Sequence, residues 1–455
     1  MRVKLLQIWQ NIRASYWFVP SIMALSAFFL AWLMTSVDAY IKPELLSNVF
    51  FIYLNQPDGA RSLLSTVAGS MITVAGVTFS ITMVVLSLAS QQFGPRLLRN
   101  FMRDTANQVV LGTFIATFLY CLLVLRTVRT AEDSSFVPHL AILMAVVMTI
   151  FSLGVFIYFI HHTAQSIQVS TIVASIATEM RAMIKKHYGE KQLFPGQLGQ
   201  ADVSELALLK GYVSNPFNIP AHKSGYLQVI NNEGLMAFAQ EKDVVIKLEH
   251  EPGDFIHEGS KLLSLYYRDT KTLSMDDVEA RIFDDFAIGN YRTHSQDLDF
   301  LFDQLSEIAL RALSPGINDP YTAMSCIDRL TDGFLHLLGR ELPSSLRFDK
   351  EGKLRVIVPA LSLESLFRKC FSPIRQCGMT SLLVNQKLLR SLFLIYEVSS
   401  DKAFKNLVRA EAWQIKQDAC QHLSPQDCQD IGLLYDRFEK GQPIGETLQS
   451  LEESA

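Results

Sequence analysis

The chain has 455 residues, of which 49% are hydrophobic and 19% charged, and its formal net charge is −4. This length suits two or three domains. The near-neutral charge argues against a nucleic-acid-binding protein, whose electrostatic footprint is a basic patch.

Four apolar stretches in the first part of the chain predict transmembrane helices. A helix needs about 20 apolar residues to cross a bilayer, and none of the four contains Asp, Glu, Lys or Arg. The sequence therefore predicts a polytopic α-helical membrane domain over residues 1–162. The stretches run from Trp17 to Val37, Leu63 to Ala89, Val109 to Leu125 and Val137 to Ile160.

The second stretch carries small and hydroxyl residues at steps of three and four, which places them on one arc of a helix. Small residues of this kind allow transmembrane helices to pack closely. The same stripe is also suited to line a water-filled pathway in a symmetric oligomer, where Arg96 and Arg99 at the cytoplasmic mouth would favour anions. The candidate pore-lining residues are Thr66, Gly69, Thr73, Gly76, Ser80 and Ser87.

Orientation follows from the Lys and Arg residues near the spans, which concentrate on the cytoplasmic side. The N-terminus and the loop between the second and third spans are the basic flanks, so we expect the N-terminus and the long C-terminal region to be cytoplasmic. Five of the six cysteines then lie in the cytoplasm, and we expect them to be reduced. The basic flanks contain Arg2, Lys4, Arg13, Arg96, Arg99 and Arg103.

The fourth span is expected to continue as one helix to Lys186, because residues 163–186 contain neither Pro nor Gly. Ile172, Ile176 and Met180 form a narrow apolar stripe on this stalk, which is typical of a helix–helix seam within one chain or between subunits. The second alternative predicts a homo-oligomer. Residues 163–200 are interpreted as the stalk and a linker.

The sequence pattern of residues 201–272 predicts a small β module, because runs of β-branched and aromatic residues are separated by turns that contain glycine. The pattern is similar to half of a lipoyl- or biotinyl-type β-sandwich. Lys223 lacks the flanking residues of a modified carrier lysine, so we expect a structural module.

Residues 273–455 predict a mostly helical cytoplasmic domain with one β-hairpin, from Leu346 to Val358. Asp299, Asp303 and Glu307 are spaced four apart, and with Asp297 or Asp319 they offer carboxylates to a divalent cation. A solvated acidic face, with Glu307 paired to Arg311, is the favoured alternative.

The segment "RALSPGINDPYTA" predicts a tight corner between two of these helices. Proline and glycine end the first helix, and an Asp followed by Pro starts the second. Only Asn318 has no local structural reason, which leaves a ligand site open. The corner consists of Ser314, Pro315, Gly316, Asn318, Asp319 and Pro320.

Three segments together resemble a bacterial family of predicted membrane proteins that is catalogued only as a domain of unknown function. They are "ALSPGINDPYTA", "IGNYRTHSQDLDF" and "TVAGVTFSITMVVLSLASQQFGPRLL". The resemblance extends over nearly the whole chain. It implies four spans in the cytoplasmic (inner) membrane of a bacterium and a cytoplasmic domain, and it implies no activity.

The sequence contains no P-loop, no nucleophile elbow, no dinucleotide fingerprint and no HExxH motif. We therefore expect no catalytic residues, no metal and no cofactor. The leading hypothesis is a homo-oligomeric passive channel for an ion or small solute, with a regulatory or assembly domain in the cytoplasm. The alternative is a non-conducting scaffold or sensor, anchored in the bilayer, that presents its cytoplasmic domain to a partner. Neither hypothesis involves nucleic acid.

Overall fold

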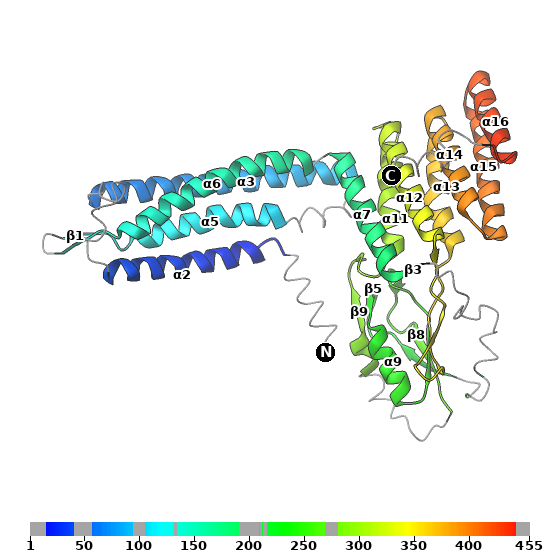
Figure 1. Cartoon of the computed structure of the whole chain (residues 1–455), viewed down its shortest axis with the longest axis horizontal. Helices are drawn as coiled ribbons and strands as arrows, with labels where there is room; N and C mark the ends of the chain where they lie inside the picture. Colours follow the sequence, from blue (N-terminus) through cyan, green and yellow to red (C-terminus); the bar gives the residue numbers. More distant parts are fainter. Residues whose placement is uncertain are drawn as a thin grey trace. The chain divides into compact units, whose positions relative to one another are not determined.

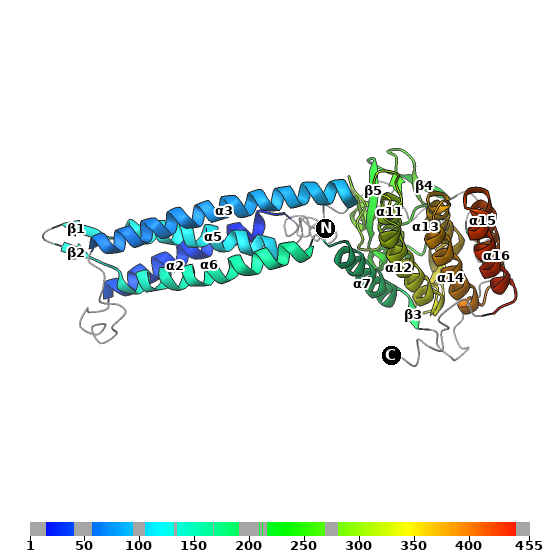
Figure 2. The same cartoon turned by 90° about the horizontal axis from the view of Figure 1, so that it is seen from above.

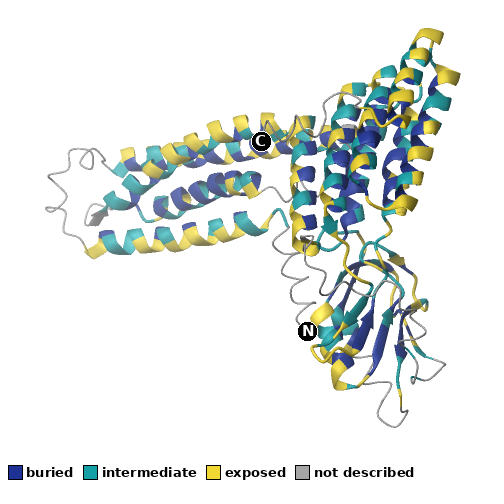
Figure 3. Cartoon of the chain, turned by 45° about the vertical axis from the view of Figure 1, so that its right-hand side comes forward, coloured by how far each residue is buried: buried dark blue, intermediate teal, exposed yellow. Residues whose placement is uncertain are grey.

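The computed structural model describes residues 15–40, 57–93, 105–131, 134–166, 168–190, 209, 212, 216–268 and 281–442. Arg96 and Arg99, the predicted cytoplasmic mouth, lie outside these residues, as does most of the predicted linker. The chain divides into two compact units, and the sequence boundary that precedes the C-terminal one lies between Thr171 and Ile172. We call them the membrane unit and the C-terminal unit. Figure 3 colours both by burial.

The membrane unit confirms the four predicted spans, because four of its helices are long and apolar enough to cross a bilayer. α5 is the central helix and packs against α2, α3 and α6 (Figures 1 and 2). A buried hydrogen bond of 3.0 Å between Thr117 and Ser152 joins α5 to α6. The helices are α2 (Phe18–Tyr40), α3 (Pro57–Phe93), α5 (Thr105–Leu125) and α6 (His139–Ser166).

One end of the membrane unit is fixed by a carboxylate that caps a neighbouring helix. Asp38, in the last turn of α2, accepts hydrogen bonds from the backbone N–H groups of Leu140 and Ala141 at 3.0 and 2.9 Å. These N–H groups belong to the first turn of α6 and have no partner within that helix. β1 (Arg129–Ala131) and β2 (Ser134–Phe136) pair antiparallel at the same end.

The prediction of one continuous stalk helix is wrong. α6 ends at Ser166, and α7 (Val169–His187) begins a separate helix that belongs almost entirely to the C-terminal unit. Its apolar stripe is buried within the chain, with Met180 fully buried against α12. The seam predicted from the stripe therefore lies within one chain, so these residues give no support to an interface between subunits.

The β part of the C-terminal unit contains two sheets, with orders β11-β12-β6-β8-β4 and β7-β5-β9. The predicted hairpin is confirmed: β11 and β12 pair antiparallel, and β12 then pairs parallel with β6. β9 pairs with β5, so strands on both sides of residues 269–280 share these sheets. The strands are β4 (Phe217–Pro220), β5 (Gly225–Ile230), β6 (Val245–Leu248), β7 (Phe255–Ile256), β8 (Lys261–Tyr266), β9 (Phe286–Gly289), β11 (Leu346–Phe348) and β12 (Leu354–Ile357), with α9 (Asn232–Glu241) between β5 and β6.

A buried arginine attaches the hairpin to this β region. Arg355, with its side chain 5% exposed, donates hydrogen bonds to Asp349 at 2.8 Å and to Asp243 at 2.7 Å. Asp349 lies in the hairpin turn, and Asp243 follows α9. A buried guanidinium needs such partners, because removal of one leaves an uncompensated charge.

The helical part packs α7 and six further helices around a core rich in phenylalanine, in which Phe334 contacts Phe302, Phe367 and Phe371. A short pair of strands, β3 (Gly189–Glu190) and β10 (Arg340–Glu341), follows α7 and α12. The helices are α11 (Leu298–Ala312), α12 (Pro320–Leu338), α13 (Leu363–Gly378), α14 (Leu382–Val398), α15 (Lys402–His422) and α16 (Pro425–Glu439).

The expectation that the cysteines outside the spans are all reduced is wrong. Cys420 and Cys428 form a disulfide between the end of α15 and the start of α16. Spacing did not indicate it, because the pair is separated by seven residues and is brought together by the turn between the two helices. Cys121, Cys326, Cys370 and Cys377 are free.

Candidate functional site

The small-residue stripe of α3 lies on the outer face of the membrane unit. Each of the six candidate pore-lining positions is exposed. The opposite face of α3 is buried: Ala60, Leu64 and Ala68 pack into a cluster with residues of α2, α5 and α6, and Met71 and Ala75 pack against Val110 and Phe114 of α5. The stripe therefore does not serve the packing of the four spans within one chain. The six positions are Thr66, Gly69, Thr73, Gly76, Ser80 and Ser87.

The stripe is smooth, and the hydroxyl hydrogens of Thr73 and Ser80 are engaged within their own helix. A Cβ atom added to Gly69 or Gly76 would meet no atom within 4 Å, apart from the glycine's neighbours and its own helix backbone. Thr73 and Ser80 donate to the carbonyl oxygens of those two glycines at 2.8 and 2.9 Å. This back-bonding satisfies each donor while leaving the hydroxyl oxygen able to accept. Such a surface is suited both to a close helix contact and to a hydrated wall.

The other outer faces of the membrane unit have a different composition. α2 exposes Leu25, Phe29 and Trp32, and α6 exposes Ile150 and Phe151, all more than half exposed. Large apolar side chains of this kind are the ordinary covering of a helix that faces lipid. The stripe on α3 is thus distinct from the faces of α2 and α6 in both size and polarity.

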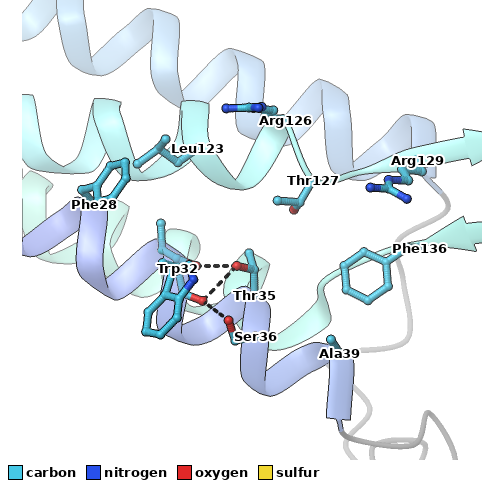
Figure 4. A pocket seen from close by; sticks show the side chains of 11 residues that line it. Phe28, Trp32, Thr35, Ser36, Ala39, Leu123, Arg126, Thr127, Arg129 and Phe136 are labelled. Atoms are coloured by element: carbon cyan, nitrogen blue, oxygen red, sulfur yellow. Dashed lines mark hydrogen bonds between the residues drawn. The ribbon is translucent and has the colours of Figure 1, made fainter.

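A cavity of about 810 Å³ lies between α2, the end of α5 and the β1–β2 pair (Figure 4). Phe28 and Trp32 form its apolar side, and Arg126 and Arg129 bring two guanidinium groups that have no partner among the described residues. An aromatic wall beside cationic groups suits the chain and headgroup of an amphiphile. None of the lining residues belongs to α3, so this cavity is separate from the stripe.

The corner between α11 and α12 is explained by its backbone. Asp319 caps α12, accepting from the N–H of Thr322 at 3.1 Å and from its hydroxyl at 2.6 Å, and Pro320 occupies the first turn. Asn318 has φ +49°, in the left-handed region that asparagine tolerates better than most residues. Its place in the corner therefore has a conformational reason, which the sequence alone did not supply.

The acidic residues around the start of α11 form ion pairs with basic side chains of the same chain. Arg292 donates two hydrogen bonds to Asp297, at 2.8 and 2.9 Å, and a third to Asp303 at 2.7 Å. Lys369 donates to Asp299 at 2.7 Å. Among the described residues no group of three or more His, Cys, Asp or Glu side chains is arranged to hold a metal ion. The metal alternative is therefore not supported, because its carboxylates are divided among Arg292, Lys369 and the cap of α12.

Arg292 and Lys369 were missed by sequence reasoning. Arg292 lies within "IGNYRTHSQDLDF", five residues before Asp297. This short separation was the only feature of the sequence that could have indicated the Arg292–Asp297 pair. Burial alone would lower the pKa of its guanidinium, but the hydrogen bonds and charges of Asp297 and Asp303 raise it instead. Lys369 comes from α13, so only the packing of α13 near α11 reveals its role.

Residues 13–393 match the family described as "Predicted membrane protein (DUF2254)". The chain belongs to the DUF2254 family. The DUF2254 chain is also similar to "Uncharacterized protein MT1328" of Mycobacterium tuberculosis, with 32% identity over 362 residues that cover 79% of this chain and 68% of the relative. "Uncharacterized protein Mb1321c" of Mycobacterium bovis matches with the same identity and coverage. No solved structure matches.

Proposed function

We propose that this DUF2254 protein forms a homo-oligomer in which α3 of each subunit faces a central hydrated axis, so that the assembly is a passive channel for an ion or small solute. The observation that carries the proposal is the outward position of the stripe. Four helices pack together through other faces, and no other described residue covers the smooth, hydroxyl-bearing face of α3.

The chemistry of the stripe suits passage without tight binding. Hydroxyl oxygens replace part of the hydration shell of a solute, and the stripe has no formal charge that would trap an ion. The large residues on the outer faces of α2 and α6 are then left to contact lipid.

A modest preference for anions belongs to the same proposal. Arg96 and Arg99 follow α3 in the sequence, and rings of arginine favour anions at a pore mouth. The proposed orientation places the N-terminus, this mouth and the C-terminal unit in the bacterial cytoplasm, as the Lys and Arg distribution predicts. The C-terminal unit would regulate or assemble the channel, and the likeness of its β region to a lipoyl-type module stays a prediction.

The second candidate is a non-conducting scaffold or sensor. The hydrogen bonds from Thr73 and Ser80 to backbone carbonyl groups of α3 favour it, because these two hydroxyl donors are satisfied without water. In that case α3 helices of neighbouring subunits meet directly, and small residues at their interface let the backbones approach closely.

Flux measurements on full-length protein in liposomes separate the two. The channel predicts chloride flux that exceeds potassium flux and is abolished by Gly76→Trp, which places an indole in the proposed lumen. Ile72→Trp is the matched control, since Ile72 is also exposed on α3 but lies off the stripe, and it should leave flux unchanged. Absence of flux from correctly assembled wild-type protein would favour the scaffold.

A further inference from the structure

The C-terminal unit contains a second cavity, of about 370 Å³, whose walls come from five places in the chain. They are Tyr188 just after α7, the turn at residues 251–254, the segment 292–299, the β11–β12 hairpin with the residues on either side of it, and α13. This volume lies at the small end of the range of about 300–1,000 Å³ that is typical of ligand pockets. Charged and polar side chains make up much of the lining, which suits a small hydrophilic ligand.

Part of the wall is fixed by internal pairs. The Arg292–Asp297 and Lys369–Asp299 ion pairs both line the cavity. The turn at Gly253 presses against the same wall: Gly253 has φ +107°, and a Cβ atom there would lie 2.3 Å from Oδ2 of Asp297. The β region and the start of α11 therefore form a preorganised surface, in which Asp297 and Asp299 each have an ion-pair partner.

Three further groups line the cavity without a side-chain partner among the described residues: the Arg347 guanidinium, the Glu251 carboxyl and the Tyr188 hydroxyl. Arg347 is half-buried. Burial lowers the pKa of its guanidinium, and no carboxylate offsets this effect. A polar group that is partly withdrawn from water and unpaired is costly, and a ligand that supplies the missing bond recovers that cost.

We propose that this cavity binds a small organic anion that carries a hydroxyl or amino group beside its carboxylate or phosphate. The anionic group pairs with Arg347, whose planar guanidinium makes two parallel hydrogen bonds to such a group. The neighbouring hydroxyl or amino group bonds to Tyr188 and Glu251. The site lies wholly within the C-terminal unit, so it does not depend on conduction through the membrane unit.

Calorimetric titration of the full-length protein in detergent tests the proposal with four probes: L-malate, succinate, 3-phosphoglycerate and inorganic phosphate. L-malate and succinate differ by one hydroxyl group. We expect one site per chain for L-malate or 3-phosphoglycerate, and about tenfold weaker binding of succinate, because it leaves Tyr188 and Glu251 unpaired. Inorganic phosphate should bind more weakly than the organic probe that binds best.

Substitutions identify the site. Arg347→Gln should weaken binding at least about tenfold through loss of a charge-assisted pair, and Arg347→Lys should restore part of it. Lys350→Gln removes one charge from the same hairpin outside the cavity, and it should leave affinity unchanged, with circular dichroism reporting the fold of each variant. The proposal is overturned if no probe binds, if inorganic phosphate binds as tightly as the organic anions, or if Arg347→Gln and Lys350→Gln have equal effects.

Discussion

The docking of α7 within its own chain can be tested at the contact between Met180 and Gly333. A Cβ atom added to Gly333 would lie 2.4 Å from Cε and 2.9 Å from Sδ of Met180. Overpacking of this kind costs about 1–3 kcal/mol, which exceeds the gain of about 1 kcal/mol from alanine's higher helix propensity. Gly333→Ala alone should therefore destabilise the C-terminal unit.

The cost of Gly333→Ala should fall when the methionine is shortened. Met180 is 0% exposed, so Met180→Ala should cost about 2–5 kcal/mol. In that background the two Met180 atoms are gone and only Cζ of Phe302, 3.0 Å from the added Cβ, remains close, so Gly333→Ala should destabilise the protein less than it does in the wild type. The double variant should thus be more stable than the sum of the single changes predicts, which is the signature of two residues in contact.

The fluorescence of Trp413 can report the unfolding of the C-terminal unit. Trp413 is the one tryptophan after Ile172, so replacement of Trp9, Trp17 and Trp32 by Phe leaves a single fluorophore in the C-terminal unit. Gly432→Ala in α16 is the matched control, because its nearest neighbour would be 3.9 Å away and the change should only stabilise. Additive effects of Met180→Ala and Gly333→Ala, or a smaller particle by light scattering for Met180→Ala, would refute the docking of α7 within one chain.

Further predictions concern the remaining features. Gly253→Ala should destabilise the protein by more than about 1 kcal/mol, because φ is positive and Asp297 is in the way; unchanged denaturant midpoints would contradict this. Arg355→Met should destabilise the protein while Asp349 remains, and Arg355→Met with Asp349→Leu should destabilise it less; equal losses would refute the pairing of Arg355 with Asp349. Partial burial and the charges of Asp299, Asp254 and Asp297, opposed by Lys369, raise the pKa of Glu251 from 4.5 to about 7. The folded state then holds a proton that the unfolded state releases, so stability should fall as pH rises from about 4.5 to about 7, and Glu251→Gln should remove that decline. Reporter fusions at Pro57 and Gln197 should report opposite sides of the membrane, and signals from the same side would contradict the proposed orientation.

The features that the sequence predicted are those with a local physical signal. The four spans follow from uninterrupted apolar length, and the hairpin follows from the alternation around Gly352, where φ is +77°. The cap at Asp319 follows from its place before Pro320. In each case the residues that specify the structure are adjacent in the chain, so no knowledge of packing was needed.

The features that the sequence did not predict depend on contacts between distant segments. No proline or glycine marks the break between α6 and α7, and the place of α7 in the C-terminal unit depends on distant contacts such as that of Met180 with Gly333 of α12. The orientation of the α3 stripe was also undetermined, since both faces of α3 are apolar enough for a membrane. The pairing of Lys369 with Asp299 joins residues 70 positions apart, and spacing within one helix cannot indicate it.

The most direct test of the proposed pathway compares two sets of exposed positions on α3. Single cysteines are placed at Thr73, Gly76 and Ser80 on the stripe and at Ile72 and Phe79 beside it, in a background without the native cysteines. All five positions are exposed in the single chain, so only a hydrated axis in the assembly distinguishes them. We predict that a membrane-impermeant, water-soluble thiol reagent modifies the three stripe positions in liposomes and spares the other two. Equal protection of all five would contradict the pathway.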